Sequence, residues 1–289
     1  MTVRRHNILA VTALSLLYLA AIIVLSIKAA TTLKFALPTS LLLLGVTFLV
    51  LVLTRRRKLE QFTLHRPLFG ILVFAICVWL YIGKYLQLPE VSTDWHISRA
   101  LIKLLLLVIV PSIYLGISEP SYLRYVFRSK NIHSDLKLTT ILLAVMVVPT
   151  FFYNASTWRP ILNGEIPVLH VIIALPVSMG YFFMVAALPE ELMFRAFIQE
   201  HLAQLLHHRL YAVVIGAMIF GYLHIHGIMR WHNVPLYIAV ARATMVQMMF
   251  GLMFATIWER TRSVLPPLVI HTVVDGITNC VWITERLFS

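Results

Sequence analysis

The chain has 289 residues, of which 60% are hydrophobic and only 12% are charged, and its mean hydropathy is +0.86. Soluble domains carry about 25% charged residues, so this composition excludes a soluble globular protein and predicts a polytopic membrane protein. The excess of 24 Lys and Arg over 12 Asp and Glu does not indicate a nucleic-acid partner, because the basic residues lie in short loops between apolar segments. The 2 cysteines both lie inside apolar segments, which excludes a disulfide framework.

A helix needs about 17–25 apolar residues to cross a bilayer. Segments of this kind lie, in chain order, near residues 8–27, 36–53, 67–88, 100–117, 138–154, 167–188, 211–228, 236–258 and 264–284. We therefore predict an all-α fold, a polytopic transmembrane helical bundle of about eight to nine spans with a C-terminal four-helix core. Residues 1–160 supply N-terminal transmembrane helices whose role the sequence does not indicate, and residues 161–289 supply the core, which holds most of the polar side chains within apolar segments.

The loops between these segments alternate between many and few basic residues, which is the pattern of the positive-inside rule. One side of the membrane collects the basic residues found at positions 4–5, 55–66, 124–137, 209 and 260–262. This alternation predicts a cytoplasmic N-terminus. We interpret the first segment as an anchor, because no small-x-small cleavage site follows it.

Residues 188–195, Leu-Pro-Glu-Glu-Leu-Met-Phe-Arg, place two carboxylates and an arginine inside a segment otherwise suited to a bilayer. Ionisable groups at membrane depth cost several kcal/mol unless they face a partner or a wet cavity, so they indicate function. On a helix, Glu191 and Arg195 are four residues apart and can pair along one face. Glu190 points about a quarter turn away and has no cation nearby on the same helix. It is therefore the candidate reactive carboxylate.

Pro189 lies in the middle of residues 167–206, which would span about 60 Å as one straight helix, and it should kink or break that helix. The part after the proline is amphipathic, and we expect its end at residues 207–209 to protrude into the cytoplasm. Its polar side consists of Arg195, Gln199, Glu200, His201 and Gln204.

Three further polar residues, His224, His271 and Asp275, are predicted to meet Glu190. A helical hairpin that turns at His208 would bring Glu190 and His224 to similar depth, because they lie 18 residues before and 16 residues after it. His271 and Asp275 are four residues apart and share a helix face. All four side chains are thus expected to converge in the cytoplasmic half of the bilayer.

A carboxylate with two histidines suits the activation of water. A carboxylate shielded from bulk water is a competent general base near neutral pH, and histidines aimed at the same point can stabilise an oxyanion or protonate a leaving group. Glu190, His224 and His271 could equally be three zinc ligands with a fourth position open for water. No His-Glu-x-x-His motif occurs, and spacing alone leaves both alternatives open.

Three motifs follow one another on successive apolar helices within about residues 167–285: Glu190-Glu191-x-x-x-Arg195, Phe220-x-x-x-His224 and His271-x-x-x-Asp275. In this order they resemble the CAAX-protease and bacteriocin-processing (CPBP) family of intramembrane proteases, which includes the eukaryotic CAAX prenyl endopeptidase. The string around the first motif is similar to that of bacterial members, which implies an integral protein of a bacterial inner (plasma) membrane.

The resemblance implies that Glu190 activates water and that His224 positions this water or stabilises the oxyanion. His271 and Asp275 would complete the catalytic core of this protease-like region. The family often has Asn at the last position, where this chain has Asp275. The added negative charge beside Glu190 favours a bound proton or a cation.

Other residues have supporting roles in this interpretation. The resemblance implies that Glu191 and Arg195 brace the first helix, whereas Phe220 is expected to pack under the site. Arg242, two turns into the eighth span, would either grip the terminal carboxylate of a substrate or, as we favour, snorkel outward or pair with an acid. Small residues are expected to allow close helix packing at Gly216, Gly221 and Gly251.

The predicted function is that of an intramembrane endopeptidase, glutamic-type or metal-dependent, that cuts a membrane-associated protein or peptide. Its partners are this substrate and the lipid bilayer, and its one candidate cofactor is zinc. A first alternative is a proton-coupled transporter in which Glu190, Arg195 and His224 relay protons, although transporters tend to show broken helices in both halves. A second alternative is a non-catalytic membrane scaffold or chaperone.

Overall fold

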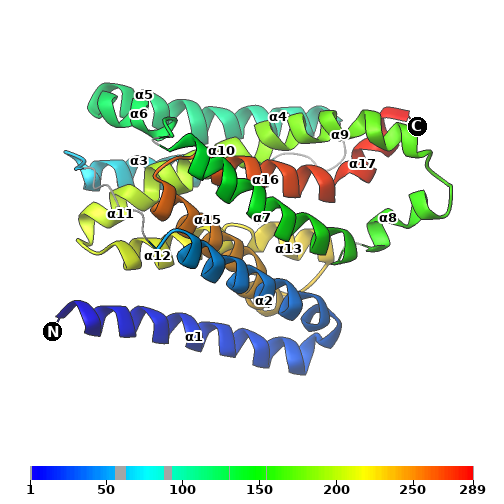
Figure 1. Ribbon diagram of the computed structural model, residues 1–289, viewed down its shortest axis with the longest axis horizontal. Coiled ribbons are helices and arrows are strands. Elements are labelled where there is room, and N and C mark those ends of the chain that lie inside the picture. Colours follow the sequence, from blue (N-terminus) through cyan, green and yellow to red (C-terminus); the bar gives the residue numbers. More distant parts are fainter. Residues whose placement is uncertain (1, 56–62, 88–92, 130, 154, 289) are drawn as a thin grey trace. The chain divides into compact units, whose positions relative to one another are not determined.

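The computed structural model describes residues 2–55, 63–87, 93–129, 131–153 and 155–288, where all regular secondary structure is helical (Figure 1). Contacts divide the chain into two compact units, Met1–Leu68 with Phe197–Arg260 and Phe69–Ala196 with Thr261–Ser289. The described helices confirm the predicted all-α, polytopic fold class. The predicted division into residues 1–160 and 161–289 stays a prediction.

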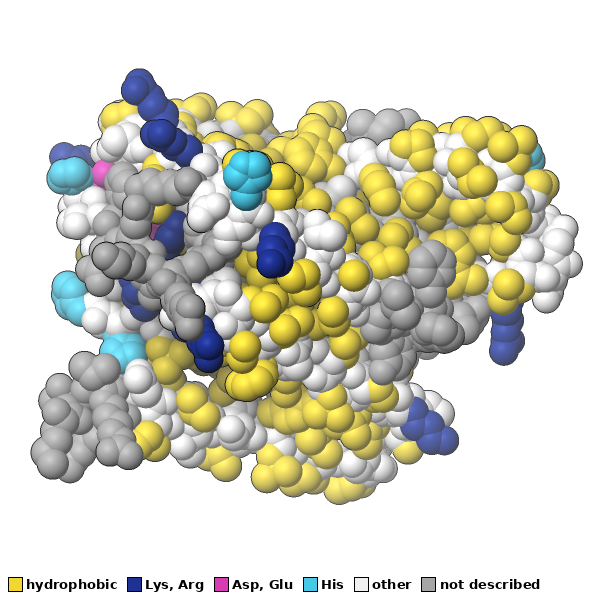
Figure 2. Space-filling model, in the orientation of Figure 1, with side chains coloured by type: hydrophobic (Ala, Val, Ile, Leu, Met, Phe, Trp, Pro, Cys, Tyr) yellow, Lys and Arg dark blue, Asp and Glu magenta, His cyan; other side chains and the backbone are white. Residues whose placement is uncertain are grey.

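Within the described residues, six helical segments are long and apolar enough to cross a membrane. They coincide with predicted spans and lie at Asn7–Lys28, Ala30–Leu53, Ala100–Ser118, Val168–Leu205, Arg209–His232 and Leu236–Thr261. Two other predicted spans coincide with the shorter apolar helices Pro67–Gly83 and Leu265–Thr278. The span predicted at 138–154 falls on a helix that ends at Tyr153. Residue 154 of this span and residue 88 of the third predicted span lie outside the described residues. Hydrophobic side chains cover much of the described surface on the face shown in Figure 2, which suits contact with lipid.

The helices of the first unit are α1 (Thr2–Lys28), α2 (Ala30–Leu53), α11 (Glu200–Leu205), α12 (Arg209–Tyr222), α13 (Ile225–His232), α14 (Leu236–Arg242), the π-helix η4 (Ala243–Gln247) and α15 (Met248–Thr261). α1 packs against α2 and α14 around a buried cluster that includes Leu25, Ala36 and Met245. α11 and α12 pack together across a turn in which His207 has a left-handed backbone, with φ 50°. This turn confirms the helical hairpin predicted at residues 207–209.

Two glycines let α12 and α15 approach closely. A Cβ atom on Gly221 would lie 2.8 Å from the backbone nitrogen of Met248, and one on Gly251 would lie 3.0 Å from the Cα of Ala217. Larger residues would push the two helices apart, so the predicted packing role of these two glycines is confirmed. Gly216 differs, because nothing lies within 4 Å of its Cβ position.

Three residues on the polar side of the segment after Pro189 are buried within the first unit. Gln199, Glu200 and His201 are each at most 1% exposed. The Arg209 guanidinium donates to Glu200 at 3.0 Å and to Glu259 at 3.3 Å. Arg209, which was expected to protrude with the end of this segment, is thus tied to two carboxylates that the helix spacing alone does not bring to it.

The helices of the second unit are α3 (Pro67–Gln87), α4 (Thr93–Leu104), the π-helix η1 (Leu105–Ile109), α5 (Val110–Ser118), α6 (Pro120–Val126), α7 (Ile132–Tyr153), α8 (Ala155–Leu162), α9 (Val168–Phe182), the π-helix η2 (Phe183–Ala187), α10 (Leu188–Glu191), the π-helix η3 (Leu192–Gln199), α16 (Leu265–Thr278) and α17 (Cys280–Phe288). The last three residues of η3 belong to the first unit. α16 packs against α7 and α9, and α17 packs against α9 around the buried residues Ala174, Cys280 and Ile283.

A close contact fixes α16 against α9. The Ser178 hydroxyl donates to the carbonyl oxygen of Gly276 at 2.8 Å. A Cβ atom on Gly276 would lie 2.9 Å from the Cγ of Met179 and 3.1 Å from its Cα. α9 leads through η2 into the turn that carries Glu190, so this contact joins α16 to the helix that precedes that turn.

A Gly276→Ala variant is expected to unfold at a lower temperature, because the added methyl group meets the Met179 backbone. Overpacking of this kind costs about 1–3 kcal/mol, against the roughly 1 kcal/mol by which alanine is favoured over glycine within a helix. Thermal unfolding in detergent measures the change. The matched control is Gly180→Ala on α9, where nothing lies within 4 Å of the Cβ position. Equal melting temperatures for the two variants would contradict the prediction.

Candidate active site

The two adjacent carboxylates lie on α10, a single helical turn between the π-helices η2 and η3. Pro189 has no N–H to offer the helix, and its ring crowds the carbonyl four residues earlier. The wider turns on either side accommodate the proline, and helical structure continues from Val168 to Leu205, so of the predicted kink or break the break does not occur. π-helical turns often occur at functional sites, and here they flank the candidate carboxylates.

The Glu191 carboxylate is fully buried and accepts hydrogen bonds from the side chains of Arg195 and His271. Its Oε2 accepts from Arg195 Nε at 3.0 Å, and both side chains are 0% exposed. This is the pairing that the spacing of four residues predicts. Its Oε1 lies 2.8 Å from Nδ1 of His271. Because an ionised carboxylate can only accept, Nδ1 is the donor, and the Glu191 carboxylate fixes the orientation of the imidazole ring.

The other ring nitrogen of His271 faces the remaining two carboxylates. Nε2 lies 3.4 Å from Asp275 Oδ2 and 3.9 Å from Glu190 Oε2. Glu190, His271 and Asp275 are therefore brought together within the second unit, as predicted from the spacing. The side chain of Asp275 is 33% exposed and that of Glu190 is 10% exposed, so the cluster is reached from the side of Asp275.

A lysine outside the predicted site completes the cluster. Lys103, near the end of α4, bonds through Nζ to Oε1 of Glu190 at 2.5 Å, and its side chain is 14% exposed. The expectation that Glu190 lacks a cation therefore holds only within its own helix. One sequence signal was available, because Lys103 lies inside the span predicted at 100–117 and a lysine at membrane depth needs a partner.

His224 lies in the first unit, directly after α12. Its Nδ1 donates to the carbonyl oxygen of Phe220 at 2.8 Å, because a carbonyl oxygen can only accept. The rings of Phe220 and His224 pack with centroids 4.9 Å apart. These contacts agree with the expected packing role of Phe220. The predicted approach of His224 to Glu190 stays a prediction.

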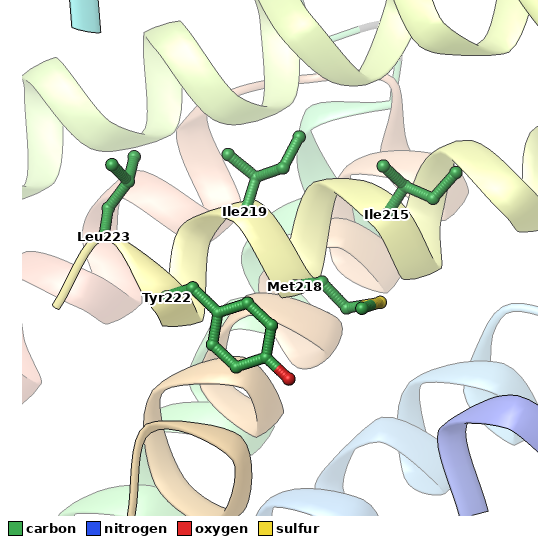
Figure 3. Close-up of a pocket in the computed structure, with 5 residues that line it drawn as sticks. All are labelled: Ile215, Met218, Ile219, Tyr222 and Leu223. Atoms are coloured by element: carbon green, nitrogen blue, oxygen red, sulfur yellow. The ribbon is translucent and has the colours of Figure 1, made fainter. Parts of the chain in front are cut away.

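Two other features of the first unit bear on ligand chemistry. An apolar pocket of about 400 Å³ is formed along α12 by Ile215, Met218, Ile219, Tyr222 and Leu223 (Figure 3). Its lining suits a hydrocarbon group and offers no charge to an ionic ligand. Arg242 places its guanidinium carbon 5.7 Å from the centre of the Phe35 ring. This cation–π contact holds the side chain on α2, and its role toward a substrate stays a prediction.

Zinc ligation is one of the two alternatives that the sequence leaves open. In the part of the chain that the structure describes, no three His, Cys, Asp or Glu side chains form a group that could hold a metal ion. The Lys103 ammonium lies on one oxygen of Glu190, where it would repel a metal ion. The zinc set of Glu190, His224 and His271 stays a prediction.

The second unit thus defines a class of membrane protein that holds a buried carboxylate–histidine cluster between helices. Residues 172–277 match the family model described as type II CAAX prenyl endopeptidase Rce1-like. Over these residues the match confirms the resemblance to the CPBP family, and it supports a CAAX-type intramembrane protease. Searches of curated proteins and of solved structures gave no match.

An Arg195→Met variant is expected to be strongly destabilised, because it leaves the Glu191 carboxylate buried without its guanidinium. Removing one partner of a buried ion pair costs about 3–5 kcal/mol. Thermal unfolding in detergent is the measurement, with Arg159→Met at an exposed position of α8 as the matched control. If both variants unfold at the wild-type temperature, the pair does not support the fold.

Proposed function

We propose that the protein is an intramembrane endopeptidase that hydrolyses a peptide bond in a membrane-associated protein or peptide, with Glu190 as the general base. The observation that carries the proposal is the arrangement of Glu190 and Asp275 around His271, inside the segment that matches a peptidase family. The ionised carboxylate is the form that can accept a proton, and the Lys103 ammonium supplies a counter-charge to that form.

In the proposed reaction, the Glu190 carboxylate takes a proton from a water molecule as its oxygen attacks the carbonyl carbon of the substrate. The same proton then passes to the leaving amide nitrogen when the C–N bond breaks. In its doubly protonated form His271 can donate from Nε2 to the developing oxyanion, since Nδ1 already donates to Glu191 and Nε2 faces the carboxylates of Asp275 and Glu190. Asp275 orients His271 and completes the pocket.

His224 belongs to the proposal through its acceptor nitrogen. The Phe220 carbonyl holds a proton on Nδ1, so in the neutral form of the ring Nε2 can accept a hydrogen bond from the attacking water. In this role His224 positions the water for Glu190. Glu191 and Arg195 act indirectly, since they hold His271 and the π-helical turn in place.

A Glu190→Gln variant is expected to lose cleavage while it still inserts into the membrane. The amide cannot accept the proton from water, and loss of a general base lowers rates by about 10²–10⁴-fold. We would compare the membrane proteomes of cells that carry wild-type protein, Glu190→Gln or the control Glu285→Gln at an exposed position of α17. Membrane proteins that are cleaved in cells with the wild type and with Glu285→Gln should remain uncleaved in cells with Glu190→Gln.

If the Glu190→Gln variant cleaves these proteins to the same extent as the wild type, the proposed function is overturned. Proteoliposomes that hold the same variants test the transporter alternative, which requires a proton flux that Glu190→Gln removes. A scaffold would keep its biological effect in Glu190→Gln cells. Cleavage that stops on addition of a zinc chelator and returns with zinc would establish the metal-dependent alternative.

We further propose that the protein lies in a bacterial inner (plasma) membrane with its N-terminus in the cytoplasm. The similarity of the string around Glu190 to bacterial family members supports the bacterial membrane, and the alternation of basic loops along the sequence supports the orientation. A protease-sensitive tag fused to the N-terminus should be protected in spheroplasts and digested in inverted vesicles. Digestion in intact spheroplasts would reverse the proposed orientation.

A further inference from the structure

Lys103 is placed to act on the candidate site from outside the matched segment. It lies on α4, directly before the π-helix η1, which packs against α10. An ammonium in a span is costly to bury unless an anion faces it. Lys103 meets this requirement through Oε1 of Glu190, the residue that the proposed function makes the base.

The charges of the cluster explain why a cation is needed there. Its three carboxylates belong to Glu190, Glu191 and Asp275, and Arg195 is bonded to Glu191. Glu190 and Asp275 both approach one atom, Nε2 of His271, at 3.9 Å and 3.4 Å. Two carboxylates that approach one atom repel one another, and only Asp275 of the two is substantially exposed to screening by water.

The Lys103 ammonium offsets part of this repulsion. It is bonded to Glu190, and Asp275 approaches the same ring nitrogen as Glu190 does, so the positive charge of the lysine acts on both carboxylates. Asparagine at position 275 would remove this repulsion and would leave the lysine only the charge of Glu190 to match. Because this chain has Asp275, the lysine and the aspartate form a compensating pair of charges around Glu190.

We propose that Lys103 is a positioning residue of the peptidase, and that it offsets the second carboxylate that Asp275 brings beside Glu190. It thereby keeps Oε2 of Glu190 against His271, where the base meets the attacking water. This inference rests on the proposed function. It assigns to a span before the matched segment a part in the reaction that the three motifs do not contain.

The test is a double-mutant cycle with purified protein in proteoliposomes. The substrate is a membrane-anchored, fluorogenic peptide that reproduces the bond cut in wild-type cells. Lys103→Met is expected to lower kcat by about 10²-fold, which is the effect of a misplaced base. KM should change by no more than about threefold, because in this proposal Lys103 acts on the base and not on the substrate. In an Asp275→Asn background the same change should lower kcat by less than about tenfold, because the repulsion is gone.

Two further variants complete the design. Lys103→Arg keeps the charge with a different shape, so its kcat should lie between those of the wild type and Lys103→Met. Lys137→Met, at an exposed position of α7, is the matched control and should leave kcat at the wild-type value. If Lys103→Met does not fold, the test compares kcat of Asp275→Asn with kcat of the double variant, in which both charges are removed together.

The inference is overturned if Lys103→Met lowers kcat equally in both backgrounds, changes only KM, or changes only the melting temperature. A double variant about 10²-fold slower than Asp275→Asn overturns it as well, by the same reasoning on coupling. These failures differ from failure of the proposed function. If the wild type cuts the peptide, Glu190→Gln does not, and Lys103→Met behaves as the wild type, only the role of Lys103 is lost.

Discussion

A charge inside an apolar helix bundle has to be matched by another charge, and this constraint organises the second unit. Glu191 is fully buried and accepts from both Arg195 and His271. Glu190 is matched by Lys103 from a different helix. Removing any one partner would leave an uncompensated charge, which costs more than the pair itself contributes. The cluster therefore specifies which helices lie together, and it also holds the imidazole ring in one orientation.

The backbone around the cluster reflects the same requirement. A regular α-helix that passes through Pro189 loses one hydrogen bond, and the proline ring clashes with the carbonyl group four residues earlier. The π-helices on either side keep the chain helical across the proline, and they leave Glu190 and Glu191 on a single α-helical turn. The buried hydroxyl of Tyr122 donates to the carbonyl oxygen of Ala196 within η3. Polar groups of this irregular segment thus find partners inside the protein, where lipid offers none.

Much of this arrangement could be predicted from local spacing. Apolar length predicted the spans, and a separation of four residues predicted that Glu191 meets Arg195 and that His271 meets Asp275. Spacing of this kind applies only within one helix. It could not identify Lys103, which lies 87 residues before Glu190, nor the Arg209–Glu259 contact across 50 residues. Pairings of that kind depend on which helices pack together, and the hydrophobic pattern does not contain that information.

The family match and the Lys103–Glu190 ion pair describe different parts of the site. The matched segment, residues 172–277, contains the three motifs but not Lys103. A motif-based description therefore counts the carboxylates of the cluster and omits one of its cations. Asp275 is the residue that makes this omission matter, since a neutral amide in its place would add no charge beside Glu190. The sequence indicated that this aspartate favours a proton or a cation, and Lys103 is a cation that the fold itself supplies. The helices before the matched segment are thus part of the electrostatic environment in which Glu190 would work.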